Sequence, residues 1–166
     1  MTTRLIWSPK LLVALATVAL LALAAPGGSA DAARKKKPDL RVTAVTVPAE
    51  AVRGGGFDVN DTVKNAGRVK AKRSFSVTYL LSTDTKPDSA DDDLRGGRTI
   101  GKLGPKKSST ATTNVLTASV TPTGTYYVIA CADSDDVIAE KHEGDNCTAS
   151  TTTIELKTKV IGGGAR

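Results

Sequence analysis

The sequence predicts an all-β fold, a β-sandwich of seven short antiparallel strands with one disulfide. Three observations support this fold class. After the first thirty residues, the remaining 136 include 19 Thr and 13 Val, and β-branched residues favour strands over helices. Apolar and polar residues alternate in seven short runs. Turn residues separate these runs, and no helical period is present.

The first thirty residues match the plan of a secretory signal peptide. Arg4 and Lys10 give a positive start, 11–25 is an unbroken run of small and apolar residues, and helix-breaking, small residues follow. Cleavage is expected after Ala30 or, by a second A-x-A match, after Ala32. The apolar run is shorter than the roughly 20 residues that span a bilayer. The mature chain is therefore predicted to be secreted, without a transmembrane anchor.

Alternating apolar residues mark the first three expected strands. The run 40–47 ends at a proline, the run 57–63 ends at a turn over 65–67, and the run 75–81 alternates without interruption. Asp61 breaks the second run, because it falls on the face that should be apolar. Either a bulge turns Asp61 outward, or its carboxylate is buried and hydrogen-bonded. A local or edge adjustment is the favoured interpretation.

Four further strands are expected in the second half of the chain. The run 98–103 is closed by Gly-Pro, and the threonine-rich run 110–120 is closed by Pro-Thr-Gly. The runs 126–132 and 147–156 complete the set. Short strands between frequent turns are typical of a sandwich.

The two cysteines, Cys131 and Cys147, are expected to form a structural disulfide. An oxidising compartment favours joining the pair. The 15 residues between them form a loop for which the chain-entropy model gives about 3 kcal/mol of stabilisation. The C-x-x-C spacing of a metal or redox site is not present.

The domain is expected over 39–156, between a disordered basic tether at 31–38 and a flexible C-terminal tail at 157–166. The tether carries four consecutive cations: Arg34, Lys35, Lys36 and Lys37. Coulomb attraction would bring them to anionic envelope polymers, and a solvated tether is the equal alternative. Nucleic acid is not an expected partner, since export removes it and no aromatic residues interleave with the basic ones.

Few residues fit a catalytic role. His142 is the single imidazole, it lies in the charged loop 140–143, and no G-x-S-x-G motif occurs. His142 is therefore interpreted as a solvated loop histidine. A zinc site would need more His or free Cys than the chain has. We expect neither an enzyme nor a bound organic cofactor.

Calcium is the one ion for which the sequence suggests a place. Five carboxylates lie within ten residues between the third and fourth expected strands: Asp84, Asp88, Asp91, Asp92 and Asp93. Calcium takes six to eight oxygen ligands, often from flexible, carboxylate-rich loops. The segment does not fit the D-x-[DN]-x-[DN]-G pattern, and a solvated, solubilising loop is the alternative.

Short motifs occur in a characteristic order along 39–156. They are Pro38-Asp39-Leu40, Gly56-Phe57, Asn65-Ala66-Gly67, Tyr79-Leu80-Leu81-Ser82-Thr83-Asp84, Gly124-Thr125-Tyr126-Tyr127, Ala132-Asp133, Val137-Ile138-Ala139-Glu140 and Glu143-Gly144-Asp145-Asn146. In order and spacing they resemble the cell-adhesion-related domain found in bacteria, CARDB. The resemblance implies an immunoglobulin-like sandwich that is extracellular and non-enzymatic, with no catalytic residues to carry over. Asp61 stands where the family usually has an apolar residue.

The expected function is that of a secreted adhesion or binding module at the bacterial cell surface, which recognises a protein or glycan through its loops. The alternative is a structural envelope protein without a specific ligand, with calcium as a stabilising ion. In an immunoglobulin-like sandwich, the basic loop 68–73 and the acidic disulfide loop share one end, where their charges compensate. The loop 84–93 is expected at the other end, and a calcium ion is expected there if anywhere.

Overall fold

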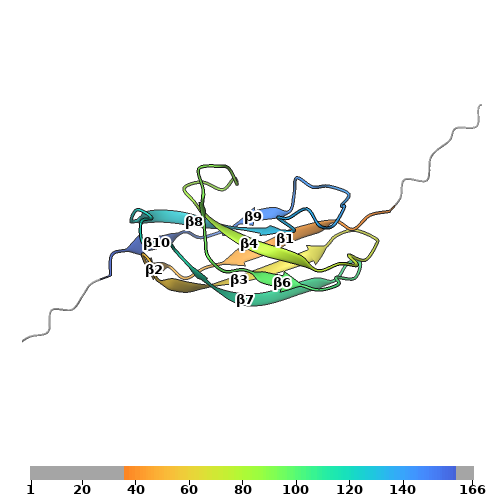
Figure 1. Ribbon diagram of the computed structural model, residues 1–166, viewed down its shortest axis with the longest axis horizontal. Helices are drawn as coiled ribbons and strands as arrows, with labels where there is room; N and C mark the ends of the chain where they lie inside the picture. Colours follow the sequence, from red (N-terminus) through yellow and green to blue (C-terminus); the bar gives the residue numbers. More distant parts are fainter. Residues whose placement is uncertain (1–35, 160–166) are drawn as a thin grey trace, which may run out of the picture. The chain divides into compact units, whose positions relative to one another are not determined.

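The computed structural model describes residues 36–159, which form a two-layered β-sandwich (Figure 1). These residues contain ten strands: β1 (Leu40–Thr46), β2 (Glu50–Val52), β3 (Gly56–Asn65), β4 (Phe75–Ser82), β5 (Asp92–Asp93), β6 (Arg98–Ile100), β7 (Ser108–Leu116), β8 (Gly124–Ala132), β9 (Cys147–Ala149) and β10 (Ile154–Lys157). In this part of the chain no helix is long and apolar enough to cross a membrane.

One layer is a three-stranded antiparallel sheet in the order β1-β3-β7. β3 is its central strand, and the register between β3 and β7 is uninterrupted from Gly56 opposite Leu116 to Lys64 opposite Ser108. The pairing of β1 with β3 contains one register shift, in the middle of β1. β1 and β7 are therefore the two edges of this layer.

The other layer has the order β2-β10-β8-β4-β5, with β6 also paired to β4 and β9 to β8. Its strands are antiparallel except for β2 and β10, which run parallel. β4 and β8 are its long central strands, and β2, β5, β6 and β9 contain only two or three residues each. Figure 1 shows β4 and β8 lying over the three-stranded layer.

The interior is filled by every second side chain of the long strands. Phe57, Val59 and Val63 of β3 are at most 6% exposed, and Phe75 and Leu81 of β4 are at most 2% exposed. Full burial of one such side chain stabilises the fold by about 2 kcal/mol. The period-2 pattern in the sequence therefore marks the core face of each strand.

The all-β sandwich is confirmed, but the described residues contain ten strands rather than seven. The expected strand 147–156 is divided into β9 and β10, because Ser150 interrupts the ladder. Its hydroxyl accepts a hydrogen bond from the Val128 N–H at 3.1 Å and donates one to the Thr152 carbonyl at 2.7 Å. The short strands β2 and β5 were not expected.

Several expected boundaries also differ. β7 covers Ser108–Leu116 rather than 110–120, and β6 ends at Ile100. β10 continues to Lys157, which was assigned to the tail. The expected signal peptide and its cleavage site lie outside the described residues, as do the last seven residues of the tail.

Asp61 is fully buried, so the favoured interpretation of a bulge or edge adjustment is wrong. β3 keeps a regular register at this residue, opposite Ala111 of β7. The carboxylate accepts a hydrogen bond from the Tyr79 hydroxyl at 2.7 Å and pairs with the Arg98 guanidinium at 2.6 Å. The second interpretation, a buried carboxylate with polar partners, is confirmed.

Candidate functional site

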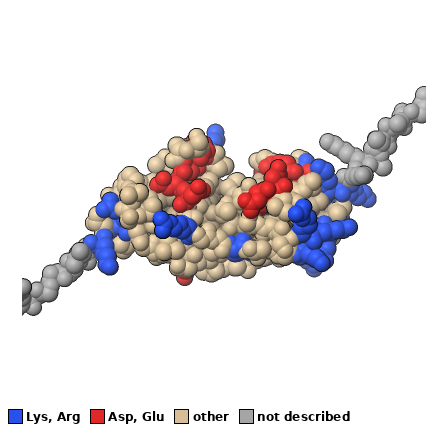
Figure 2. All heavy atoms as spheres, viewed as in Figure 1, with Lys and Arg blue, Asp and Glu red and all other residues tan. Residues whose placement is uncertain are grey.

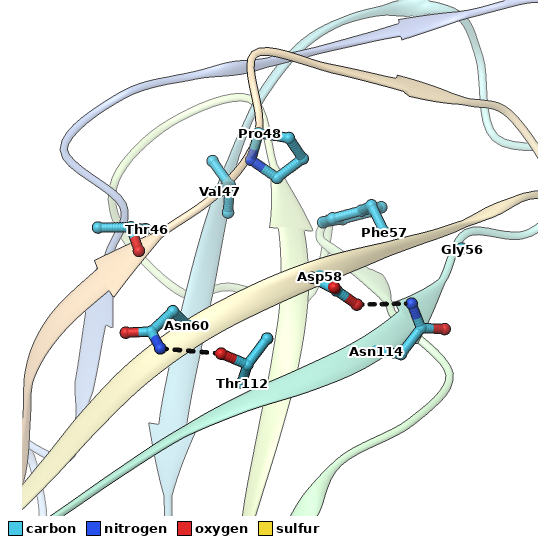
Figure 3. A pocket seen from close by; sticks show the side chains of 9 residues that line it. All are labelled: Thr46, Val47, Pro48, Gly56, Phe57, Asp58, Asn60, Thr112 and Asn114. Carbon is cyan, nitrogen blue, oxygen red and sulfur yellow. Dashed lines mark hydrogen bonds between the residues drawn. The ribbon is translucent and has the colours of Figure 1, made fainter.

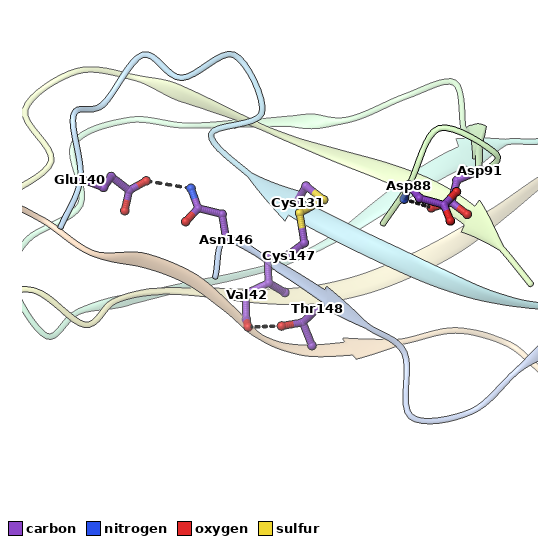
Figure 4. The surroundings of a disulfide bond; sticks show 8 residues. All are labelled: Val42, Asp88, Asp91, Cys131, Glu140, Asn146, Cys147 and Thr148. Atoms are coloured by element: carbon purple, nitrogen blue, oxygen red, sulfur yellow. Dashed lines mark hydrogen bonds between the residues drawn. A yellow bond between two sulfur atoms is a disulfide. The ribbon is translucent and has the colours of Figure 1, made fainter. Parts of the chain in front are cut away.

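The loop 133–146 joins β8 to β9, and a disulfide between Cys131 and Cys147 closes its base. The same two residues are cross-strand partners in the β8–β9 pairing. The predicted disulfide is confirmed, and it lies at the neck of the loop (Figure 4). Both ends of the loop are therefore fixed to the sandwich.

Asp133 shapes the beginning of this loop. Its backbone has a φ of 55°, and its carbonyl accepts a hydrogen bond from the Asp136 N–H at 2.9 Å. Its buried carboxylate accepts hydrogen bonds from the N–H groups of Val137 at 3.1 Å and Ile138 at 2.8 Å. Aspartate tolerates left-handed backbone and caps turns in this way. Burial raises the pKa of Asp133.

Glu140 attaches the far part of the loop to the start of β1. Its side chain is buried, and its carboxylate accepts hydrogen bonds from the Leu40 N–H and, at 3.0 Å, from the Asn146 side-chain amide (Figure 4). Burial raises the pKa of Glu140 to about 7, with a further contribution from the negative charge of Glu143. A carboxylate that titrates near neutral pH thus joins the loop to the first strand.

A charged cluster lies beside this buried carboxylate. Arg41 Nη2 is 2.7 Å from Asp145 Oδ2 and 3.2 Å from Asp39 Oδ2. His142 Nδ1 is 3.0 Å from Asp39 Oδ1, and the His142 side chain is 46% exposed. His142 is therefore an exposed loop histidine, as expected, with a carboxylate partner that the sequence did not indicate.

This cluster does not fit a metal ion. Ligand atoms of Asp39, His142 and Asp145 lie within 4.8 Å of one another, and within 36–159 they are the one such group of three. The Arg41 guanidinium already supplies positive charge between the two carboxylates, so a cation would have to displace it. None of the five aspartates predicted to bind calcium belongs to this group.

The five predicted calcium ligands lie in the loop after β4 and in β5: Asp84, Asp88, Asp91, Asp92 and Asp93. Three of them cap turns within this loop. Asp84 accepts a hydrogen bond from the Lys86 N–H at 2.7 Å, and Asp88 accepts one from the Ala90 N–H at 2.7 Å. Asp91 accepts one from the Asp88 N–H at 2.9 Å. These contacts are those of a polar turn, and calcium binding stays a prediction.

The two acidic loops leave opposite ends of the β4–β8 pair. Ser82 at the end of β4 pairs with Tyr127 near the start of β8, so the loops that follow these strands diverge. The basic segment 68–73 lies beside the disulfide loop, where Arg73 Nη1 donates to the Val137 carbonyl at 3.5 Å. The expected arrangement is confirmed. Figure 2 shows two separate acidic clusters, with Lys and Arg gathered near one of them.

Two of the four cations in the predicted tether, Lys36 and Lys37, belong to the described residues, and both are exposed. Lys37 Nζ donates to the Glu140 carbonyl at 3.0 Å, and the Lys141 N–H donates to the Pro38 carbonyl at 2.9 Å. Lys37 and Pro38 therefore bond to the disulfide loop, although both belong to the segment that was expected to be disordered. Arg34 and Lys35 lie outside the described residues, and contact with anionic polymers stays a prediction.

Sequence reasoning missed a shallow groove of about 480 Å³ on the outer face of the three-stranded layer (Figure 3). Two polar pairs cross it: Asn114 Nδ2 donates to Asp58 Oδ1 at 2.8 Å, and Asn60 Nδ2 donates to Thr112 Oγ1 at 3.0 Å. Pro48 lies at one end. The polar residues between the core positions of β3 and β7 were the available signal, but pairing of these strands was needed to bring them together.

Comparison with known proteins connects this fold to one family. The CARDB family model matches residues 37–150. A CARDB domain from Pyrococcus furiosus, crystallised in complex with di-metal ions, is 20% identical with a TM-score of 0.53, over 75% of this chain and 97% of that one. A domain from Methanosarcina acetivorans, which is named as part of a cell surface protein, is 17% identical with a TM-score of 0.52. This likeness covers 74% of this chain and 95% of that one. Likeness at this level of identity shows the fold. The comparison with curated proteins found no match.

Proposed function

The chain belongs to the CARDB family, and from that membership we propose that it is a secreted, non-enzymatic adhesion module that acts at the bacterial cell surface through its loops. The family match and the CARDB neighbours support a binding module rather than a catalyst. The signal-peptide pattern of the first thirty residues supports export. The Methanosarcina neighbour, described as a cell surface protein, supports the location.

The observation that carries the proposal is the fixed conformation of the disulfide loop. The loop is held at its neck by the Cys131–Cys147 disulfide, in its first turn by Asp133, and in its far part by Glu140. A loop that is ordered before binding loses less conformational freedom when it meets a partner. Structural anchoring of this kind therefore favours recognition by the exposed side chains of the loop.

The proposed partner is a cell-surface protein or glycan. Lys141, His142 and Glu143 are consecutive exposed residues of the anchored loop, and they offer both hydrogen-bond donors and acceptors. Mixed polarity of this kind suits a neutral or mixed-charge surface better than a uniformly anionic polymer. We therefore place specific recognition at this loop and nonspecific attraction at the basic N-terminal segment.

A binding assay with isolated cell envelopes tests the proposal. Protein expressed from the full sequence is incubated with envelopes at low and high salt, since salt screens attraction between exposed charges. Retention that survives high salt, and that falls several-fold in the double variant Lys141→Ala with His142→Ala, supports recognition by the disulfide loop. The matched control is Thr85→Ala with Lys86→Ala in the opposite loop. Retention that high salt abolishes overturns the proposal.

The second candidate is a structural envelope protein without a specific ligand, stabilised by calcium at the loop 84–93. The concentration of five carboxylates in that loop favours it, because carboxylate oxygens are preferred calcium ligands. The Pyrococcus CARDB domain, crystallised in complex with di-metal ions, supports metal binding on this fold. In this case the basic residues Arg34, Lys35, Lys36 and Lys37 would attract anionic envelope polymers, and envelope retention would be lost at high salt.

A further inference from the structure

A concentration of cations lies at the end of the sandwich where β3 ends and β7 begins. Two loops form this end: 66–74, between β3 and β4, and 101–107, between β6 and β7. The sequence has no Asp or Glu from 62 to 83 or from 94 to 132. We refer to the exposed cations of the two loops and of the adjoining end of β3 as the basic end: Lys64, Arg68, Lys70, Lys72, Arg73, Lys102, Lys106 and Lys107.

The charge of the basic end is not neutralised by ion pairs within 36–159. The ion pairs of these residues use other cations: Arg41, Arg98, His142 and Lys157. Arg73 lies at the border of the basic end, since its Nη1 donates to the Val137 carbonyl of the acidic disulfide loop. Figure 2 shows Lys and Arg gathered near one acidic cluster and extending past it. The basic end is therefore an exposed surface of one sign of charge.

One buried residue, Asn65 at the end of β3, holds the two loops together. Its side-chain amide donates to the Val69 carbonyl at 2.8 Å and to the Leu103 carbonyl at 3.1 Å. Its backbone N–H donates to the Lys107 carbonyl at 2.9 Å, and its carbonyl accepts from the Lys106 N–H at 2.8 Å. The backbone that carries the cations is therefore fixed before a partner binds, which lowers the conformational cost of binding.

The contact between the loops also brings like charges together. Ala71 and Leu103 are buried and form an antiparallel bridge, with backbone hydrogen bonds of 2.9 and 3.1 Å. Lys72 follows Ala71 and Lys102 precedes Leu103, so the two lysines flank the bridge on the same side. Like charges that face each other across paired strands are destabilising. An anion bound at these lysines would remove their repulsion.

The N-terminal segment reaches the same end of the sandwich. The Ala66 N–H donates to the Asp39 carbonyl at 2.6 Å. Gly67 lies so close to this segment that a Cβ on it would stand 2.7 Å from the Lys37 carbonyl oxygen and 2.8 Å from the Pro38 carbonyl carbon. Lys37 therefore lies beside the loop 66–74, and the folded domain continues the group of cations that begins in the N-terminal segment.

We propose that the basic end binds a linear polyanion, a polymer that carries a phosphate group at each repeat. Most of its cations are lysines, whose compact point charges suit successive phosphate groups, whereas arginine suits the bidentate recognition of a single one. The cations come from three segments spread over this end, so a polymer contacts several of them at once and a free phosphate ion does not. This surface is separate from the exposed residues of the disulfide loop, and its ligand is independent of the partner of that loop.

Two other anionic partners fit the basic end less well. Binding to a lipid surface is strengthened by apolar side chains that enter it. The large apolar side chains that are exposed in the described part of the chain, Val52, Leu116 and Val120, lie at the opposite end of the sandwich. Single-stranded nucleic acid stacks its bases on aromatic side chains, and neither 66–74 nor 101–107 contains one. Charge without apolar or aromatic contacts favours a phosphate polymer.

Binding of long-chain inorganic polyphosphate to protein expressed from the full sequence tests the proposal. Calorimetric titration from about 50 to about 300 mM NaCl should show an affinity that falls as salt rises, because phosphate contacts release counterions. The triple variant Lys70→Gln, Lys72→Gln and Lys102→Gln should lower the affinity about tenfold or more and flatten its salt dependence. The control variant Arg53→Gln, Lys86→Gln and Lys159→Gln removes three exposed charges at the opposite end. It should lower the affinity about twofold or less, because salt screens distant charges.

Two further ligands distinguish a polymer from other sources of phosphate. Sodium orthophosphate, at the same concentration of phosphate groups, should not displace polyphosphate, and phosphatidylglycerol vesicles should bind more weakly than polyphosphate does. Melting temperatures at or above that of the parent chain show that the variants are folded, since the first triple variant relieves like-charge repulsion. Equal affinity losses in the two triple variants overturn the proposal, because net charge rather than the basic end then determines binding. Displacement by orthophosphate or tighter binding to the vesicles also overturns it.

Discussion

The guanidinium of Arg98 donates two hydrogen bonds to the carboxylate of Asp61, with 2.6 Å between Nη2 and Oδ1 and 2.9 Å between Nε and Oδ2. Asp61 lies on β3 in one layer and Arg98 on β6 in the other, so the ion pair connects the two layers. The Tyr79 hydroxyl donates to the same carboxylate at 2.7 Å. Burial raises the pKa of Tyr79 to about 12, so this hydroxyl keeps its proton at neutral pH.

Removal of Arg98 should be strongly destabilising. Arg98→Met leaves the fully buried Asp61 carboxylate without its cation, and the expected loss of unfolding free energy is about 3–5 kcal/mol. Tyr79→Phe removes one of several hydrogen bonds to the carboxylate, and about 1 kcal/mol is expected. Urea unfolding followed by circular dichroism measures both. A loss below about 1 kcal/mol for Arg98→Met would contradict this role of the pair.

The double variant Asp61→Leu with Arg98→Met separates the ion pair from side-chain volume. Apolar residues of similar size at both positions leave no buried charge, so most of the stability lost in Arg98→Met should return. Asp61→Val alone should remain destabilised, because it leaves the guanidinium without its carboxylate in a position that is 12% exposed. Recovery in the double variant shows that the isolated charge, rather than lost packing, causes the destabilisation.

The sandwich could be predicted because the alternation of apolar and polar residues is a local property of the sequence. Alternation in 57–63 and 75–81 identifies which side chains face the core, and the structure buries those side chains. The partner of Asp61 is 37 residues away and belongs to the other layer. No local period can indicate Arg98, which is why the pattern alone favours a bulge or edge adjustment over a buried, hydrogen-bonded carboxylate.

The same reasoning explains what was missed at the loops. Glu140 looks like one member of a solvated acidic stretch, and its burial depends on the approach of Leu40, 100 residues earlier in the chain. The disulfide was predictable, because only two cysteines are present and export favours their pairing. The position of β7 at the edge of its layer could not be predicted, because it depends on the order of the strands in the sheet.

Stability should depend on pH through Glu140. Its pKa rises from 4.5 to about 7 on folding, so between these values the folded chain holds a proton that the unfolded chain has released. This protonation stabilises the fold progressively as the pH falls from about 7 towards 4.5, by up to about 3 kcal/mol. The contribution is lost as the pH rises through 7, where a buried carboxylate must carry its charge.

Glu140→Gln isolates this contribution, because the variant cannot titrate. Urea unfolding of the parent chain and the variant at pH 5, 6, 7 and 8 should show the parent gaining stability relative to Glu140→Gln as the pH falls. Glu155→Gln, at an exposed position on β10, controls for the removal of one carboxylate. Parallel pH profiles of the parent chain and Glu140→Gln would show that Glu140 does not titrate in this range.

The disulfide should contribute stability without being required for the fold. Cys131→Ala with Cys147→Ala should lower the unfolding free energy by about 3 kcal/mol, because it restores the freedom of a long loop in the unfolded chain. The loop keeps its attachments through Glu140 and Asp133, so the variant should still fold. Thermal melting with and without reductant measures the effect. Reductant should lower the melting temperature of the parent chain and leave that of the double variant unchanged.

Calcium should raise the melting temperature if the loop 84–93 binds it. An ion that binds only the folded state adds about 2.7 kcal/mol at a hundred times its Kd, and magnesium, which demands a smaller octahedral site, should add less. Asp91→Asn with Asp93→Asn removes two carboxylates of this loop and should abolish the calcium-dependent shift. Asp135→Asn with Asp136→Asn makes the same change in charge at exposed residues of the disulfide loop and should preserve the calcium-dependent shift.

A calcium-dependent shift that survives in Asp91→Asn with Asp93→Asn would place the ion elsewhere. No shift in the parent chain would mean that the five carboxylates form a solvated loop, whose oxygens serve the turn caps at Lys86 and Ala90.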